Sequence, residues 1–308
     1  MSDILKELYN EDKTDVEEII NNILSVAWKC KTAINAETFF LQKNKKLKDF
    51  NDARVIVIIP TLVKLYESLI YDLVVDYFTK KVNLDVRYQF GGVKKGSTYA
   101  VMCNIRINLD KHNSNSLLLL DLSKGYDTIL FDHLFKFIAN IDDVDIKTLV
   151  YNWTILVYNL DIIMNNSKIR KTRGIAMGLS LSSIIFVWYI DNILRDFDKS
   201  RLTMYIDDLA IIISFLESME KNYKFVMDVI GSLEKFGLVV NRKKTILISS
   251  NELVIKTFKN NFKVINEDKY LGRQICLSGD GRIINDDRFF NKKGFRVFAI
   301  PAFATFFC

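Results

Sequence analysis

Two neighbouring acids, Asp207 and Asp208, lie between apolar runs at residues 202–204 and 209–213. Apolar runs separated by a short polar step predict a β-hairpin whose turn carries the acids. Adjacent carboxylates repel each other, so one of them tends to keep its proton unless a cation such as Mg²⁺ offsets the charge. Taken alone, the four residues 205–208 fit an ordinary acidic turn better than a metal site.

A third acid, Asp121, ends the apolar run at residues 117–120, which is typical of a strand buried on both faces. A carboxylate at the end of such a strand is costly unless it is exposed or binds a cation. Asp127 lies near the start of a helix expected over residues 131–138, and we interpret it as a cap of that helix.

Three further stretches have residue types suited to a nucleotide. Arg54 precedes a strand expected at residues 55–59, from where a guanidinium can reach a triphosphate, although an Arg at a strand start is usually just exposed. Residues 89–98 contain three glycines and two lysines, without the spacing of a P-loop. Small residues at 174–183 precede an apolar helix expected over residues 182–198 and permit close packing, although a tight loop before a buried helix is the simpler interpretation.

Composition limits the class of protein. The chain has 308 residues, 49% of them hydrophobic, which is enough for a large core with two or three subdomains. Net charge is +6, and basic residues cluster at 43–48, 168–173 and 242–244, as suits a phosphate backbone, although each cluster alone is typical of solvated surface. Four scattered cysteines predict no zinc site and fit a reducing compartment.

The elements that must position these residues follow from apolar periodicity. Beside the strands above, helices are expected at residues 15–29, 61–77, 99–109 and 217–236, the last ending at Gly237, with a further strand at 246–248. No signal peptide and no apolar run of membrane-spanning length is visible, so we expect a soluble protein.

In this order, the segments resemble the motifs of a reverse transcriptase, most closely those of non-long-terminal-repeat (LINE-like) retrotransposons. The resemblance covers roughly residues 45–285, and seven segments carry it: 54–67, 89–98, 121–127, 174–183, 205–208, 237–245 and 270–272. A single Tyr-x-Asp-Asp is a weak signal, whereas seven segments in family order are a strong one.

Three departures from the family pattern matter. Gly125 stands where the first catalytic motif usually has Ala, and Ala176 and Met177 stand where the middle motif usually has Pro and Gln before Gly178. A Pro usual near Ser183 is absent. Because Met lacks the amide donors of Gln, we expect nucleotide handling to be altered.

The resemblance implies an α+β fold with the fingers and palm of a right-hand polymerase and an antiparallel palm sheet packed on helices. It divides the chain into an N-terminal helical extension at residues 1–44, fingers and palm at 45–272, and a short, incomplete thumb or aberrant tail at 273–308. We interpret this as a truncated or frameshifted copy of an element.

The implied function is RNA-directed DNA polymerisation. Asp121, Asp207 and Asp208 would be the catalytic acids and would hold two Mg²⁺ ions, with Mn²⁺ as an alternative, that activate the primer 3′-hydroxyl and neutralise the triphosphate. Arg54 would hold the triphosphate, and Tyr126 would be the steric gate that excludes a 2′-hydroxyl.

The remaining roles also come from the resemblance. Met177 and Gly178 would border the base and sugar, and Lys244 would be a proton donor to pyrophosphate or a charge partner. The expected partners are an RNA template, a DNA primer and dNTPs, with no membrane. Target-primed copying happens at the chromosome, which is compatible with an intracellular, nuclear location but does not establish one, and no strong basic import signal stands out.

Two alternatives remain open at the level of the sequence. One is an inactive, decayed palm that at most binds nucleic acid, which Met177 and the short C-terminus favour and the three acids oppose. The other is an RNA-dependent RNA polymerase, which Tyr126 opposes because such an enzyme should not exclude ribose. Replacing Tyr126 or the acids in a polymerase assay discriminates between these classes.

Overall fold

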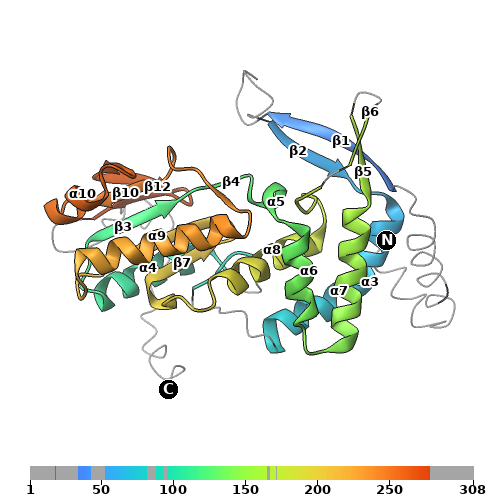
Figure 1. The fold of residues 1–308 in the computed structure, drawn as a ribbon, viewed down its shortest axis with the longest axis horizontal. Helices are drawn as coiled ribbons and strands as arrows, with labels where there is room; N and C mark the ends of the chain where they lie inside the picture. Colours follow the sequence, from blue (N-terminus) through green and yellow to red (C-terminus); the bar gives the residue numbers. More distant parts are fainter. Residues whose placement is uncertain are drawn as a thin grey trace, which may run out of the picture.

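The computed structural model describes residues 18, 34–42, 53–81, 88–92, 96–164, 167–170 and 172–277 (Figure 1). The helix expected over residues 15–29 lies outside these ranges apart from Glu18, and so does the basic stretch at residues 43–48. Residues 278–308, which hold most of the expected tail, also lie outside them.

A five-stranded sheet carries the acidic hairpin. Its strand order is β11-β10-β3-β8-β7, with bounds Lys263–Ile265, Ile246–Ser249, Ser116–Leu120, Asp208–Ile212 and Leu202–Tyr205. All neighbours are antiparallel except β10 and β11. The expected buried strand, the hairpin and the antiparallel palm sheet are therefore confirmed.

Both faces of this sheet are covered, because alternate residues of a strand point to opposite faces. Leu117, Leu119 and Ala210 pack in one cluster with residues of α4 (Thr98–Lys111) and of the β12–β13 hairpin (Glu267–Tyr270 and Arg273–Cys276). Leu118 and Ile211 belong instead to the larger core, with residues of α8 (Ser180–Ile193), α9 (Met219–Lys235) and α10 (Glu252–Phe258). Burial on both faces explains the unbroken apolar run.

A second, four-stranded sheet lies near the opposite end of the molecule's long axis (Figure 1). Its order is β2-β1-β5-β6, with bounds Ala53–Ile58, Ile34–Gln42, Leu160–Met164 and Ser167–Arg170. Beneath it run α3 (Thr61–Asp76), which continues as η2 (Tyr77–Lys81), and α6 (Phe131–Ala139) and α7 (Val144–Tyr158). Of these strands the sequence predicted β2 alone, and it did not predict α7.

The ends of two helices can be compared with the expected ones. Helix α8 ends at Ile193 rather than near 198, and a short 3₁₀ helix, η3 (Lys199–Arg201), leads into β7. Helix α9 stops before Gly237, whose φ of 90° suits glycine, as expected.

One expectation was wrong. Asp127 does not cap the helix that begins at Phe131, because it lies inside a separate short helix, α5 (Gly125–Thr128), and Leu130 occupies the cap position.

A two-stranded pair, β4 (Leu122–Ser123) and β9 (Val239–Val240), completes the described elements. None of the helices described is both long and apolar enough to cross a lipid bilayer.

Candidate active site

The three acids come together at one edge of the five-stranded sheet. The register pairs Leu120 of β3 with Leu209 of β8, so Asp121 and Asp208 are the next residues on the two strands. Tyr205 pairs with Asp208 across the hairpin, which leaves Ile206 and Asp207 as its two-residue turn. Residues far apart in the sequence thus meet because β3 and β8 are neighbours.

Electrostatics also couple these acids. Burial, followed by the charges of Asp207 and Asp121, raises the pKa of Asp208 to about 6. All three side chains are half-buried. Their mutual repulsion and their hard oxygen donors fit a divalent cation of the Mg²⁺ kind, which would relieve both effects. Among the residues that the structure describes, however, no group of three or more Asp, Glu, His or Cys side chains is arranged so that it could hold a metal ion by itself.

Tyr126 interacts electrostatically with Asp207 of this acidic edge. Its hydroxyl donates to Ser183 Oγ at 3.3 Å, and its ring stacks on Phe186 with centroids 4.5 Å apart. Burial raises the pKa of Tyr126, and the charge of Asp207 adds to that rise. Two residues of α8 therefore fix the ring of the predicted steric gate beside the turn.

The loop before α8 is joined to the same region. Ile175 N donates to Tyr126 O at 2.9 Å. Met177 is half-buried, and Gly178 is exposed with a φ of 116°. A Cβ at Gly178 would lie 3.1 Å from Val57 O of β2, so this glycine gives close contact between the loop and the four-stranded sheet.

For two residues that are predicted to bind the nucleotide, the structure gives only part of the surroundings. The backbone of Arg54 lies in β2, opposite Leu41, whereas its side chain is outside the described part of the structure. Lys244 is exposed, in a loop anchored to the acidic edge: Asn241 N donates to Asp121 O at 2.8 Å, and Asp121 N donates to Thr245 Oγ1 at 3.3 Å. The loop of Lys244 therefore lies against the first acid.

The sequence analysis missed the supporting contacts of two residues. Tyr270 Oη donates to Asp208 O at 3.0 Å, and burial raises the pKa of this tyrosine well above its usual value. Glu67 of α3 accepts from Ser180 N and Leu181 N at the start of α8, at 2.9 and 2.8 Å. Both residues belong to segments that carry the resemblance, 54–67 and 270–272, but nothing local marks Glu67 as the cap of a distant helix.

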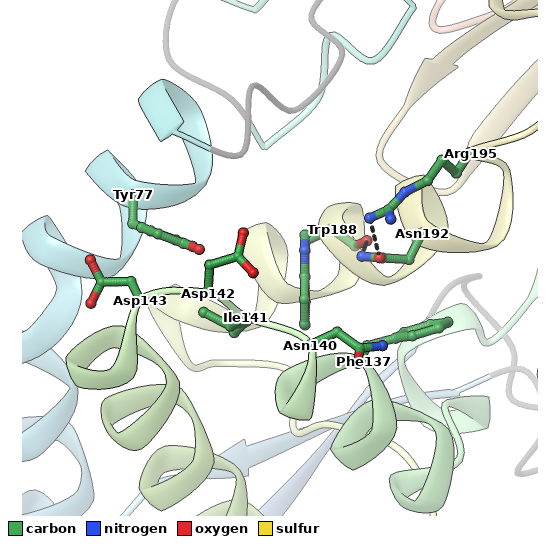
Figure 2. A pocket seen from close by; sticks show the side chains of 9 residues that line it. All are labelled: Tyr77, Phe137, Asn140, Ile141, Asp142, Asp143, Trp188, Asn192 and Arg195. Carbon is green, nitrogen blue, oxygen red and sulfur yellow. Dashed lines mark hydrogen bonds between the residues drawn. The ribbon is translucent and has the colours of Figure 1, made fainter.

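A cavity of about 680 Å³ lies elsewhere, between η2, the turn from α6 to α7, and the end of α8 (Figure 2). Tyr77, Asp142, Trp188 and Arg195 are among the residues that line it. None of the three acids, nor Tyr126, Met177 or Gly178, contributes to its wall. The acidic edge is thus separate from this cavity.

The chain was compared with known proteins. The family model described as "Reverse transcriptase (RNA-dependent DNA polymerase)" matches residues 41–275. No curated protein matches. Among solved structures, an apo telomerase from Candida tropicalis, truncated from the C-terminal domain, matches with a TM-score of 0.55 and 18% identity over 87% of this chain and 60% of that one.

A telomerase from Candida albicans, in complex with the TWJ fragment of telomeric RNA, matches with a TM-score of 0.56 and 13% identity. That match covers 83% of this chain and 48% of the telomerase. At such identities the likeness shows a shared fold. The chain spans at most 60% of the length of these two structures.

Proposed function

We propose that this chain, which belongs to the reverse transcriptase family, is the RNA-directed DNA polymerase of a non-long-terminal-repeat retroelement. The observation that carries the proposal is the convergence of Asp121 with Asp207 and Asp208 at one edge of the five-stranded sheet. The retroelement class rests on the motif resemblance, since the telomerase neighbours share the fold alone.

The acids would act by holding and orienting the reacting groups. When bound there, Mg²⁺ or Mn²⁺ would supply charge stabilisation and an activated primer 3′-hydroxyl. Asp121 follows the end of β3, Asp208 begins the neighbouring β8, and Asp207 lies in the turn, so the chain offers carboxylates from two segments. Positioning and fixed charge then contribute most of the rate.

Nucleotide selection would fall to residues beside the acids. The ring of Tyr126, stacked on Phe186, is suited to lie under the incoming sugar. Met177 and Gly178 would border the base and sugar, Arg54 would bind the triphosphate, and Lys244 would meet the leaving pyrophosphate. The tie between the loop of Lys244 and Asp121 supports the last role.

The partners would be an RNA template, a DNA primer and dNTPs. The telomerase from Candida albicans is in complex with an RNA fragment, and the shared fold supports a nucleic-acid partner here. We assign residues 45–272 to the fingers and palm. In this assignment β2, β5 and β6, with α3 and α7, belong to the fingers, and the five-stranded sheet belongs to the palm. Strand β1 lies within residues 1–44, where a helical extension was expected, and it pairs with β2 and β5 of the fingers.

The test is primer extension on an RNA template with Mg²⁺, comparing the wild type with Asp207→Asn. We expect the substitution to lower extension at least about 100-fold, because it removes a charge from the acidic edge. Asp228→Asn, at an exposed position on α9, is the control and should retain activity. Chelation should stop the reaction, and added Mg²⁺ or Mn²⁺ should restore it.

Two other outcomes would redirect the assignment. Absence of extension by a folded wild type that binds primer–template would favour the decayed palm. Extension with ribonucleotides in preference to dNTPs would favour an RNA polymerase.

A further inference from the structure

The turn that carries Asp207 contains an unfavourable backbone conformation. Ile206, the first residue of the turn, has a φ of 60°. The left-handed region is rare for any residue except glycine, and a β-branched side chain there is an outlier that persists only where the surroundings enforce it. Something must therefore hold Ile206, which is directly followed by Asp207, in place.

Gln89 contacts both backbone polar groups of this strained residue. Its Oε1 accepts from Ile206 N at 3.1 Å, and its Nε2 makes a long hydrogen bond of 3.5 Å to Ile206 O. The same Oε1 also accepts from Gly91 N at 2.9 Å. Gln89 is only 2% exposed, so water does not compete for these groups.

The backbone around Gln89 is fixed against the hairpin as well. Met204 N donates to Tyr88 O at 2.6 Å, and Phe90 N donates to Met204 O at 2.9 Å. A Cβ at Gly91 would lie 2.4 Å from Ile206 N and 2.8 Å from the carbonyl carbon of Tyr205, so no larger residue fits there. The glycine is thus required by contact with the turn.

We infer that Gln89 is a positioning residue of the polymerase, which holds Ile206 in its left-handed conformation and thereby sets the direction of Asp207. The inference rests on the proposed function, because Asp207 matters to catalysis only if the chain is a polymerase. Gln89 itself touches neither substrate nor metal in this role. It acts through the backbone of the turn.

The first test is Gln89→Met in the full chain, which keeps the length of the side chain and removes its hydrogen bonds. We expect kcat for primer extension to fall about 10- to 100-fold, because a small misplacement of a catalytic group has that effect. The KM for dNTP and the Kd for primer–template should change little. Tyr189→Phe is the control, since it also removes a hydrogen bond of a buried side chain, from Tyr189 Oη on α8 to Phe236 O at the end of α9.

The second test relieves the strain itself. Asn tolerates the left-handed region far better than Ile, so Ile206→Asn should make the turn less dependent on Gln89. In that background Gln89→Met should lower kcat by no more than about 3-fold, which measures the coupling between the two residues. Equal losses of kcat in both backgrounds, or an equal loss in Tyr189→Phe, would overturn the inference.

A measurement that needs no activity separates this inference from the proposed function. In hydrogen exchange, amides of the peptide that spans residues 204–208 should exchange slowly in the wild type and faster in Gln89→Met, with Tyr189→Phe unchanged. An unchanged rate in Gln89→Met would overturn the bracing role. If the wild type is inactive but Gln89→Met still speeds amide exchange in residues 204–208, the polymerase assignment is overturned and the role of Gln89 in holding the turn is supported.

Discussion

The ring of Tyr126 is held by a stacking contact with Phe186 and a hydrogen bond to Ser183, both on α8. If the ring blocks a 2′-hydroxyl, Tyr126→Val should raise the incorporation of ribonucleotides relative to deoxynucleotides at least about 10-fold, because a pocket enlarged by several carbons loses that much discrimination. The measurement is primer extension with each nucleotide type supplied alone.

Tyr126→Phe is the matched control for the gate. It keeps the ring and removes only the hydrogen bond to Ser183, so discrimination against ribose should persist. If Tyr126→Phe relaxed discrimination as much as Tyr126→Val, the hydroxyl rather than the ring would be responsible. If neither variant changed discrimination, the steric-gate role would be wrong.

Gly125, one of the departures from the family pattern, is explained by its neighbour. A Cβ at this position would lie 2.7 Å from Cζ of Phe186, a ring that is fully buried. We expect Gly125→Ala to lower the free energy of unfolding by about 1–3 kcal/mol through overpacking. In a Phe186→Leu background, where the ring is gone, the same change should cost much less.

Urea unfolding of the two single variants and the double variant measures this coupling as a double-mutant cycle. Additive effects would show that the space at Gly125 is unrelated to Phe186. A strong coupling would mean that the large ring of Phe186, on which Tyr126 stacks, requires glycine at position 125.

Among the elements, α8 begins without a cap of its own, since Leu179 offers no side-chain hydrogen bond. Glu67 supplies one from α3, and it also accepts from Trp153 Nε1 at 3.3 Å. Burial raises the pKa of Glu67, and these donors lower it again only in part. The carboxylate thus joins α3, α7 and α8 at the loop that contains Met177.

Glu67→Gln should lower the free energy of unfolding by about 1–3 kcal/mol, because one amide nitrogen would then face a backbone N–H. It should also raise the KM for dNTP, since the loop of Met177 and Gly178 would loosen. Urea unfolding and steady-state kinetics measure the two effects. Glu234→Gln, which removes an exposed ion pair with Arg242, should cost less than about 1 kcal/mol. Equal costs in the two variants would contradict the capping role.

The sequence predicted the palm elements well because their signals are local. The run at residues 117–120, the hairpin at 202–213 and the helix that stops at Gly237 each have an apolar pattern and a clear end. In the four-stranded sheet only β2 has such a signal. Its other strands, β1, β5 and β6, mix polar and apolar residues.

The same distinction holds within the site. The motif resemblance identified the acids and Tyr126, and the structure brings them to one edge. The roles of Glu67 and Gln89 depend on partners 113 and 117 positions away, Ser180 and Ile206, so no local pattern reveals them. The role of the Arg54 side chain and the nature of residues 278–308 stay predictions, because both lie outside the described part of the structure.

At the scale of the whole molecule, exposed basic residues lie on both sheet regions. Lys168 and Arg170 are on β6 of the four-stranded sheet, and Lys243 and Lys244 are in the loop tied to Asp121. Arg170 makes an ion pair of 2.9 Å with Asp161, so not all of this charge is available to a ligand. With a net charge of +6, the chain as a whole attracts a polyanion.

If these two groups contact phosphates of the primer–template, binding must weaken as salt rises, because each contact releases counterions. Removing one contact should reduce the slope of log K against log salt concentration by about 0.7–0.9. We therefore expect Lys168→Gln and Lys243→Gln each to weaken binding at low salt and to flatten the slope by that amount. Lys256→Gln, at an exposed position on α10, loses the same charge and should leave the slope unchanged. An equal flattening in all three variants would mean that the net charge alone governs binding, and that neither sheet region forms a track for the nucleic acid.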